Sequence, residues 1–225
     1  MSVSVKVEAH SQHRAPAKPA PKLGAKRERT RKKILEAAFG LIGNEKGLTV
    51  RIEEICAAAR VSRGTFYNYF TGLEQLFEVL AIELSHDLNS ALVSTFDDEV
   101  RSHAEGSNAA IQHYLNYARC DPAWAWAMVH LNAFGPTFGA ESWDACYRAI
   151  AKGIEAGEFD VPNATVGRDL MTGTVLATVR TMLRSGGAEA QPRIVAYHLL
   201  RGLGVPDARA REITDRPLPE IVVSK

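Results

Sequence analysis

Apolar residues recur at three- and four-residue steps through most of this chain. An early run, "ILEAAFGLI", covers residues 34–42, and a longer one, "LEQLFEVLAIELSHDLNSAL", covers residues 73–92. Such spacing places the apolar side chains on one face of an α-helix, and no segment shows the two-residue alternation of a half-buried strand. The sequence therefore predicts an all-α fold.

Capping and turn residues divide the chain into helices. We expect Thr49, Ser62, Ser107, Asp121 and Asn163 to begin helices, with Pro122 in a first turn after Asp121. The expected helices cover about 26–42, 50–58, 62–69, 72–95, 107–120, 122–134, 141–156, 164–183 and 192–204.

Composition and helix length suggest four regions. Residues 1–25 are rich in Ala, Pro and Lys without apolar periodicity, which predicts a disordered basic arm. Residues 26–71 hold three short helices with a tight turn between the second and third, a pattern typical of a helix-turn-helix unit. The long helix from residue 72 opens a second helical domain, which extends to residue 215, and residues 216–225 form a tail. No Gly-, Pro- or Ser-rich linker separates the long helix from the small unit, so the two should move together.

The net charge of +1 conceals a strong asymmetry. Residues 1–70 contain 14 Lys and Arg against 6 Asp and Glu, whereas residues 71–225 contain 13 against 20. A basic end attracts polyanions such as nucleic acid. A solvated tail is the alternative, but it accounts only for residues 1–25 and not for "KRERTRKK" (26–33), which continues into a helix.

Several classes of protein find no support in the sequence. No run of about 18 apolar residues could span a membrane, and the N-terminus lacks the apolar region of a secretory signal. The three cysteines are widely spaced and, like the scattered histidines, form no metal-ligand or disulfide pattern. We found no phosphate-binding loop or nucleophile motif. We therefore expect a cytoplasmic protein with no metal, no cofactor and no enzymatic activity.

Residues 62–70, "SRGTFYNYF", have the composition of a recognition helix, which enters the major groove of DNA with its N-terminal residues nearest the bases. Phe66 and Phe70 can face the core, while Arg63 suits a guanine edge or a phosphate. A short aromatic core helix is the alternative. The residues expected to face DNA are Ser62, Arg63, Gly64, Thr65, Tyr67, Asn68 and Tyr69, with further contacts from Lys26, Arg27, Arg31, Thr49 and Arg51.

The stretch 52–80, "IEEICAAARVSRGTFYNYFTGLEQLFEVL", resembles the signature of the tetracycline-repressor (TetR) family, and 29–47 continues the resemblance. The matching residues are Ile55, Ala59, Val61, Ser62, Gly64, Thr65, Phe66, Tyr67, Tyr69, Phe70, Glu74 and Leu76. The resemblance implies a DNA-binding, usually homodimeric and ligand-responsive transcriptional regulator. Arg60 stands where the family prefers glycine, and Leu73 replaces a lysine that often contacts the DNA backbone. At the second helix, "TVR" (49–51) departs from the common Thr–Ser, so Arg51 is an alternative to Thr49 as the phosphate contact.

Aromatic residues are concentrated between positions 114 and 147. They predict either a well-filled core or interface, or the lining of an apolar pocket for a small-molecule effector of apolar or aromatic type. The candidate ligand-binding residues are Tyr114, Tyr117, Trp124, Met128, His130, Phe134, Trp143 and Tyr147.

The last two long helices, near 164–183 and 192–204, carry apolar and small residues on one face and are the expected homodimer interface. A helix pair buried within one chain is the alternative. Together these features predict a repressor that binds a palindromic operator in double-stranded DNA and releases it when an effector binds. A sequence-tolerant, nucleoid-type DNA binder without an effector, and a helical enzyme or carrier with a vestigial helix-turn-helix, remain the other candidates.

Overall fold

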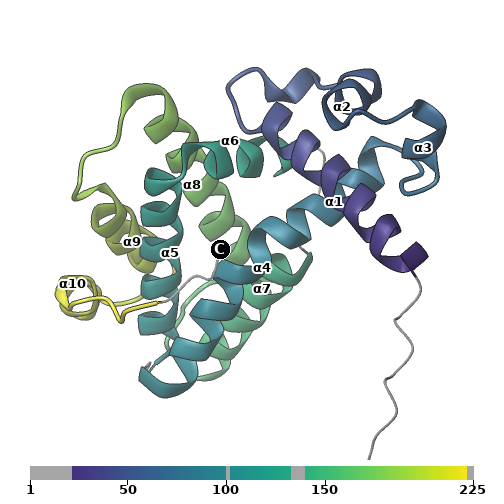
Figure 1. Ribbon diagram of the computed structural model, residues 1–225. Helices are drawn as coiled ribbons and strands as arrows, with labels where there is room; N and C mark the ends of the chain where they lie inside the picture. Colours follow the sequence, from purple (N-terminus) through teal and green to yellow (C-terminus); the bar gives the residue numbers. More distant parts are fainter. Residues whose placement is uncertain (1–21, 100–101, 133–139, 222–225) are drawn as a thin grey trace, which may run out of the picture.

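The computed structural model describes residues 22–99, 102–132 and 140–221, and every regular element in these ranges is a helix (Figure 1). This confirms the predicted all-α class. The elements, in chain order, are α1 (Lys22–Ile42), the 3₁₀ helix η1 (Gly47–Thr49), α2 (Ile52–Ala59), α3 (Arg63–Tyr67), α4 (Leu73–Glu99), α5 (His103–Cys120), α6 (Pro122–Leu131), α7 (Ala140–Glu155), α8 (Ala164–Ser185), α9 (Gln191–Gly202) and α10 (Asp207–Asp215).

Three of the predicted helix starts are confirmed by the side-chain caps. Ser62, Asp121 and Asn163 each accept a hydrogen bond, 3.0 Å long, from the backbone N–H three residues ahead. Each bond satisfies a donor that the first turn of a helix leaves unpaired, which is why these residue types favour this position.

Two predicted starts were wrong. The start of α5 is capped by Ser102, whose hydroxyl accepts from the N–H of Glu105 at 3.2 Å, so Ser107 lies inside the helix. Thr49 ends η1 and donates its hydroxyl to the carbonyl of Lys46 at 3.3 Å instead of capping α2. Helix α10 was not predicted.

The N-terminal helices enclose a core of their own. Helices α1 to α4 contribute most of its buried side chains, and α6 adds Ala127 and Leu131. The other members are Ile34, Leu35, Ala38, Ile42, Ile55, Cys56, Ala59, Phe66, Phe70, Leu76, Phe77, Leu80 and Ala81. This cluster holds the short helices α2 and α3, which are too short to be stable alone.

A second, larger core joins the C-terminal half of α4 to helices α5 to α10. Leu88 and Leu92 of α4, Leu115 of α5, and Trp124 and Met128 of α6 are among its buried side chains. The chain thus has a small N-terminal helix-turn-helix domain and a larger helical domain.

Helices α4 and α6 connect the two cores, and Figure 1 shows α6 between the α1–α3 unit and the other helices. The indole N–H of Trp124 in α6 donates to the carbonyl of Leu84 in α4 at 2.9 Å. The imidazole Nδ1 of His130 lies 2.9 Å from the carbonyl oxygen of Ile42, at the end of α1. A side chain at Gly43 would come within 3.0 Å of the carbonyl of Ala123, so glycine permits α1 and α6 to approach closely.

Candidate DNA-binding face and ligand cavity

The turn between α2 and α3 contains a residue in the left-handed region. Arg60 has φ 55° and ψ 47°, and its N–H bonds to the carbonyls of Ala57 and Cys56 at the end of α2. It is the position where the sequence pattern led us to expect glycine. The non-glycine backbone there is strained, since a Cβ in this region crowds the following carbonyl.

Helix α3 presents one buried face and one exposed face. Phe66 and Phe70 are almost fully buried, as predicted, and contact each other with ring centroids 5.8 Å apart. The exposed residues at and along the helix are Ser62, Arg63, Gly64, Tyr67 and Asn68. A Cβ at Gly64 would meet only the Ser62 hydroxyl, at an ordinary contact distance of 3.9 Å, so nothing within the described chain requires glycine there.

Arg63 is held in place by two neighbours. Its guanidinium is 2.9 Å from a carboxylate oxygen of Glu53 in α2. A hydrogen bond with Tyr67 and the charge of Glu53 raise the pKa of Arg63. Tyr67 is 48% exposed, so its hydroxyl stays on the same open face as the guanidinium.

Three other predicted DNA-facing residues, Ser62, Thr65 and Tyr69, have internal partners. The hydroxyls of Ser62 and Thr65 are 2.9 Å apart. Tyr69 is half-buried, and the guanidinium of Arg27 from α1 lies 5.9 Å from the centre of its ring. Arg27 therefore reaches the end of α3, which brings a basic residue of α1 beside the recognition segment.

The remaining predicted DNA contacts lie outside the α3 segment. Arg31 forms an ion pair with Glu83 of α4 at 2.9 Å, so it points to α4 instead of to α3. Lys26 is exposed on α1. Arg51 is exposed before α2, and its backbone N–H donates to the carboxylate of Glu54 at 2.8 Å. The ion-pair partners Glu53 and Glu83 were not foreseen, because neither lies next to its arginine in the sequence.

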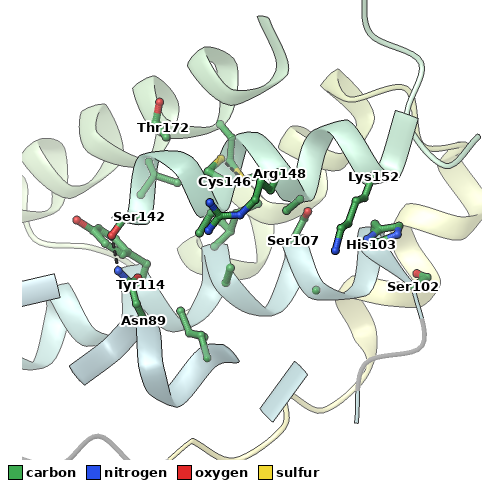
Figure 2. Close-up of a pocket in the computed structure, with 18 of the residues that line it drawn as sticks. Asn89, Ser102, His103, Ser107, Tyr114, Ser142, Cys146, Arg148, Lys152 and Thr172 are labelled. Atoms are coloured by element: carbon green, nitrogen blue, oxygen red, sulfur yellow. Dashed lines mark hydrogen bonds between the residues drawn. The ribbon is translucent and has the colours of Figure 1, made fainter. Parts of the chain in front are cut away.

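The larger domain contains a cavity of about 640 Å³ among α4, α5, α7 and α8 (Figure 2). This volume is in the usual range for sites that bind small organic molecules. The cavity is lined by Asn89, Leu92, Ser102, His103, Gly106, Ser107, Ala110, Ile111, Tyr114, Ser142, Ala145, Cys146, Arg148, Ala149, Lys152, Glu158, Met171, Thr172, Val175 and Leu176.

Of the predicted ligand-binding residues that the structure describes, only Tyr114 lines this cavity. Trp124 and Met128 are buried in the core, and Trp124 packs edge-on against Tyr114 and Tyr117 at ring-centroid distances of 5.0 and 4.8 Å. His130 lies at the junction with α1.

Two more of the predicted ligand residues contact α8 instead of the cavity. Trp143 has the guanidinium of Arg168 over its ring at 4.1 Å, and Tyr147 is 6.0 Å from the same group. Phe134 lies outside the described residues.

Burial controls the protonation of two cavity groups. It raises the pKa of the Tyr114 hydroxyl, and it raises the pKa of the Cys146 thiol to about 12. Both groups are therefore neutral at physiological pH. The Tyr114 oxygen and the hydroxyl of Ser107 are buried and have no hydrogen-bond partner among the described residues.

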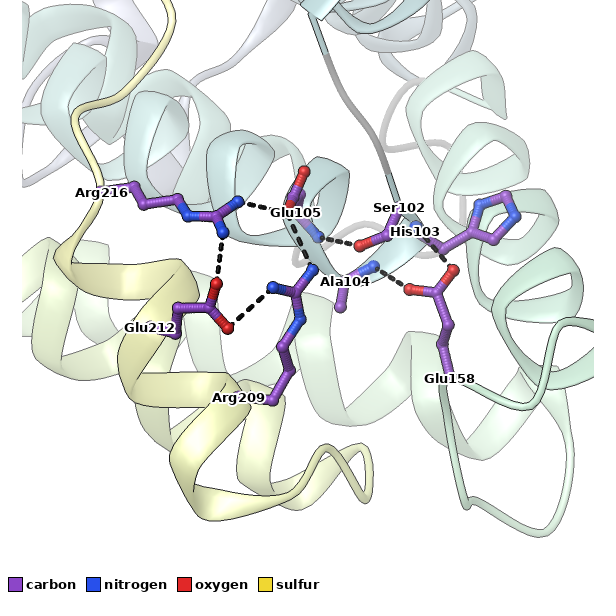
Figure 3. Close-up of polar contacts among 8 residues, drawn as sticks. All are labelled: Ser102, His103, Ala104, Glu105, Glu158, Arg209, Glu212 and Arg216. Carbon is purple, nitrogen blue, oxygen red and sulfur yellow. Dashed lines mark hydrogen bonds and ion pairs between the residues drawn. The ribbon is translucent and has the colours of Figure 1, made fainter.

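Glu158, the acidic residue that lines the cavity, is hydrogen-bonded to the start of α5. The carboxylate of Glu158 accepts from the backbone N–H groups of His103 and Ala104 at 3.1 and 3.0 Å (Figure 3). Burial alone would raise the pKa of Glu158, but these hydrogen bonds outweigh burial and lower it. Its negative charge is thus stabilised by the N-terminal end of the helix.

Helix α10 is attached to the same end of α5 by ion pairs. Arg209 and Arg216 lie 2.9 and 2.7 Å from Glu105, and both also pair with Glu212 (Figure 3). Glu105 is well covered, with a side-chain exposure of 13%. These contacts hold the cavity's α5 wall against the C-terminal helix.

A small helix-turn-helix unit with an exposed second helix, joined by a long helix to a domain with a cavity, defines the class of DNA-binding transcription regulators. Residues 34–80 match the family model "Bacterial regulatory proteins, tetR family", and residues 103–216 match "Tetracyclin repressor-like, C-terminal domain". The chain therefore belongs to the TetR family.

Solved structures have the same architecture. RolR in complex with resorcinol is 29% identical, with a TM-score of 0.71 over 88% of this chain and 100% of RolR. The fatty acid degradation regulator FadR from Bacillus halodurans is 19% identical, with a TM-score of 0.60 over 79% of this chain and 97% of FadR. An ArpA-like gamma-butyrolactone receptor is 21% identical, with a TM-score of 0.57 over 84% of this chain and 96% of the receptor. These last two similarities concern the fold alone. No curated protein sequence matches significantly.

The described residues form neither a metal site nor a membrane span. No three His, Cys, Asp or Glu side chains there are grouped so that they could hold a metal ion. None of the described helices is long and apolar enough to cross a membrane.

Proposed function

We propose that the chain is a transcriptional repressor that binds its operator as a homodimer and releases it when a small molecule occupies the cavity. The observation that carries this proposal is the double role of α4. Leu76 and Leu80 are buried in the N-terminal core, whereas Asn89 and Leu92 of the same helix line the cavity. A ligand that displaces the cavity end of α4 therefore acts on the DNA-binding unit.

In this proposal α3 is the recognition helix and enters the major groove. Arg63 contacts a guanine edge or a phosphate, and Gly64 lets the backbone come close to DNA. Tyr67 donates to a phosphate, and Asn68 is the second residue able to read a base. The exposed face of α3 and the chain's membership of the TetR family support this placement. The flanking contacts come from Lys26, Arg27, Thr49, Arg51, Ser62, Thr65 and Tyr69, whereas Arg31 is left out because Glu83 holds its guanidinium.

The proposed dimer interface is the exposed face of α8 and α9. Val166, Leu170 and Ile194 are 47%, 37% and 50% exposed, which is unusual for large apolar side chains. Leu170 and Gly202 join the two helices into one surface, since a side chain at 202 would come within 3.0 Å of Leu170. A dimer would place two recognition helices on half-sites about one turn of DNA apart.

The proposed effector is a small hydroxylated aromatic molecule. RolR binds resorcinol, and the whole of RolR resembles 88% of this chain. Apolar walls and free hydroxyls in the cavity suit a ring with polar substituents.

The test begins with selection of genomic fragments by the purified protein, which supplies operator DNA. The double variant Arg63→Ala, Tyr67→Phe should lose at least a hundredfold in operator affinity in an anisotropy titration. Arg211→Ala, on α10 at the side of the molecule away from α3 (Figure 1), is the matched control and should bind as the unchanged protein does.

Two outcomes would contradict the proposal. Undiminished binding by the double variant would remove α3 from the DNA interface. Equal affinity for the selected fragment and for random duplex would indicate a sequence-tolerant binder.

A further inference from the structure

We infer that the cavity selects an elongated hydroxyaryl carboxylate, a ligand with a carboxylate at one end and a hydroxyl at the other. This inference rests on the proposed function and narrows its effector to an anionic class. It depends on three features of the cavity: two unpartnered hydroxyls, a pair of cations and the spacing between them.

The two hydroxyls belong to α5. Ser107 is 4% exposed, and the hydroxyls of Ser107 and Tyr114 have no hydrogen-bond partner among the described residues. Both side chains line the cavity. A buried hydroxyl without a partner is unfavourable, so each of the two is suited to bind a polar atom of a ligand.

Three other polar groups of the wall are engaged or neutral. Asn89 donates to Ser142, and the hydroxyl of Thr172 donates to the carbonyl of Arg168. The Cys146 thiol is protonated, as its raised pKa requires. These residues therefore complete the wall and add no charge.

The cations come from α7. Arg148 and Lys152 lie one helical turn apart, line the cavity and are exposed, so they stand where the cavity meets solvent. Neither has an ion-pair partner within the described residues. Glu158 is the acidic residue among those that line the cavity, and its oxygens accept from the N–H groups that begin α5. Among the described residues that line the cavity, two cations thus stand against one carboxylate, which leaves this end with a net positive charge.

Ser107 belongs to that positive end. In Figure 2, Lys152 extends from α7 towards the α5 segment that carries His103 and Ser107. Arg148 lies farther along α7, beside Cys146 and between Ser107 and Tyr114, and Tyr114 lies at the opposite end beside Asn89 and Ser142. Arg148, Lys152 and the Ser107 hydroxyl can all donate hydrogen bonds, and a carboxylate accepts several at once. Because Glu158 already occupies the start of α5, the ligand's carboxylate binds these side chains.

The spacing determines the ligand's length. Ser107 and Tyr114 are seven residues apart on one helix, so their Cα atoms are separated by about 10.5 Å along its axis, and in Figure 2 the two side chains lie at opposite ends of the cavity. Leu92, Ile111, Met171, Val175 and Leu176 make the walls between the two ends apolar. One aromatic ring with a short spacer fits this distance, whereas a single dihydroxybenzene ring is too short to reach both ends.

The experiment compares four probes by calorimetry on the full chain. They are 4-hydroxycinnamate, cinnamate without the hydroxyl, the neutral methyl ester of 4-hydroxycinnamate, and resorcinol. We expect 4-hydroxycinnamate to bind at least tenfold more tightly than each of the other three. Release of operator DNA, followed by anisotropy, should rank the probes in the same order.

Matched variants assign each end. The double variant Arg148→Gln, Lys152→Gln should abolish the preference for the acid over its ester, with ester affinity changed less than threefold. Tyr114→Phe should abolish the preference for 4-hydroxycinnamate over cinnamate, with cinnamate affinity unchanged. Arg148 and Lys152 are exposed, and phenylalanine keeps the ring of Tyr114, so circular dichroism should show an unaltered fold.

Failures of the two proposals are distinguishable. If resorcinol or the ester binds as tightly as the acid and releases DNA, the carboxylate inference is wrong and the proposed function stands. If the acid binds with the expected preference but DNA is not released, the inference stands and the repressor mechanism is wrong. If no probe binds, the inference is overturned, while selection of operator DNA is judged separately.

Discussion

The imidazole of His130 donates a hydrogen bond to the carbonyl oxygen of Ile42, with 2.9 Å between the two atoms. One residue belongs to α6 of the larger domain and the other ends α1 of the DNA-binding domain. His130 is 6% exposed and stacks on Trp126 with ring centroids 5.4 Å apart. The bond thus fixes the relative position of the two domains in a buried place.

We predict that His130→Ala lowers the free energy of unfolding by about 2 kcal/mol, because a buried carbonyl loses its donor and the imidazole leaves a space. Urea denaturation followed by circular dichroism measures the change. Arg119→Ala, an exposed substitution on α5, should stay within about 0.5 kcal/mol of the unchanged protein. An unaltered midpoint in His130→Ala would mean that this contact contributes nothing to stability.

The exposed apolar face of α8 and α9 supports a second prediction. Val166→Asp combined with Ile194→Asp should raise the dimer dissociation constant at least a hundredfold, because two unpaired charges would be buried in the interface. Light scattering over a concentration series gives the mass directly. Ile82→Asp, on an exposed position of α4, is the control and should leave the mass unchanged. A dimer that persists in the double variant would place the interface elsewhere.

The helix-turn-helix unit could be predicted because its signals are local. Ser62 caps α3 three residues before the N–H that it accepts from, and Phe66 and Phe70 lie one turn apart on its buried side. Such relationships depend on positions a few residues apart, so the sequence alone displays them. Local signals failed at the start of α5, because Ser102 and Ser107 are both acceptable caps and only tertiary contacts decide between them.

The cavity could not be predicted from the aromatic residues. Large rings fill space, and Trp124 is 3% exposed in the core. The cavity instead lies between small residues of two helices, such as Gly106 and Ala110 of α5, and Ala145 and Ala149 of α7. Their spacing of four residues is readable in the sequence, but which two helices face each other is decided by packing of the whole domain.

Glu158 predicts how the larger domain responds to acid. Its folded-state pKa lies below the ordinary value of 4.5, so its stabilising contribution is complete above that value and is lost as the pH falls through the folded-state pKa. Glu158→Gln should therefore cost about 0.5 kcal/mol at pH 7 and less near pH 3. Urea denaturation at both pH values tests this, with the exposed Glu155→Gln as control. The same loss at both pH values would show that the charge is unimportant.

The ion pair between Glu53 and Arg63 implies that DNA competes with an internal partner. Glu53→Gln should tighten operator binding about threefold at low salt, since Arg63 is released and one repulsion with phosphate disappears. The gain should vanish near 0.5 M salt. Glu78→Gln, exposed on α4, changes the net charge equally and should have a smaller effect. Equal gains in both variants would indicate only a general charge effect.

Arg60 allows a prediction with opposite effects on stability and binding. Its left-handed backbone has φ 55°, and a non-glycine residue there is unfavourable by about 1 kcal/mol. Arg60→Gly should raise the free energy of unfolding by about that amount. If the exposed guanidinium also binds a phosphate, the same substitution should weaken operator binding and reduce the slope of log K against log salt by about 0.9.

Arg60→Ala separates the two effects, since it keeps the backbone strain and removes the charge. It should weaken DNA binding as Arg60→Gly does, without the gain in stability. If both variants keep full affinity and an unchanged salt slope, Arg60 contacts no phosphate and the strain in the turn is merely tolerated.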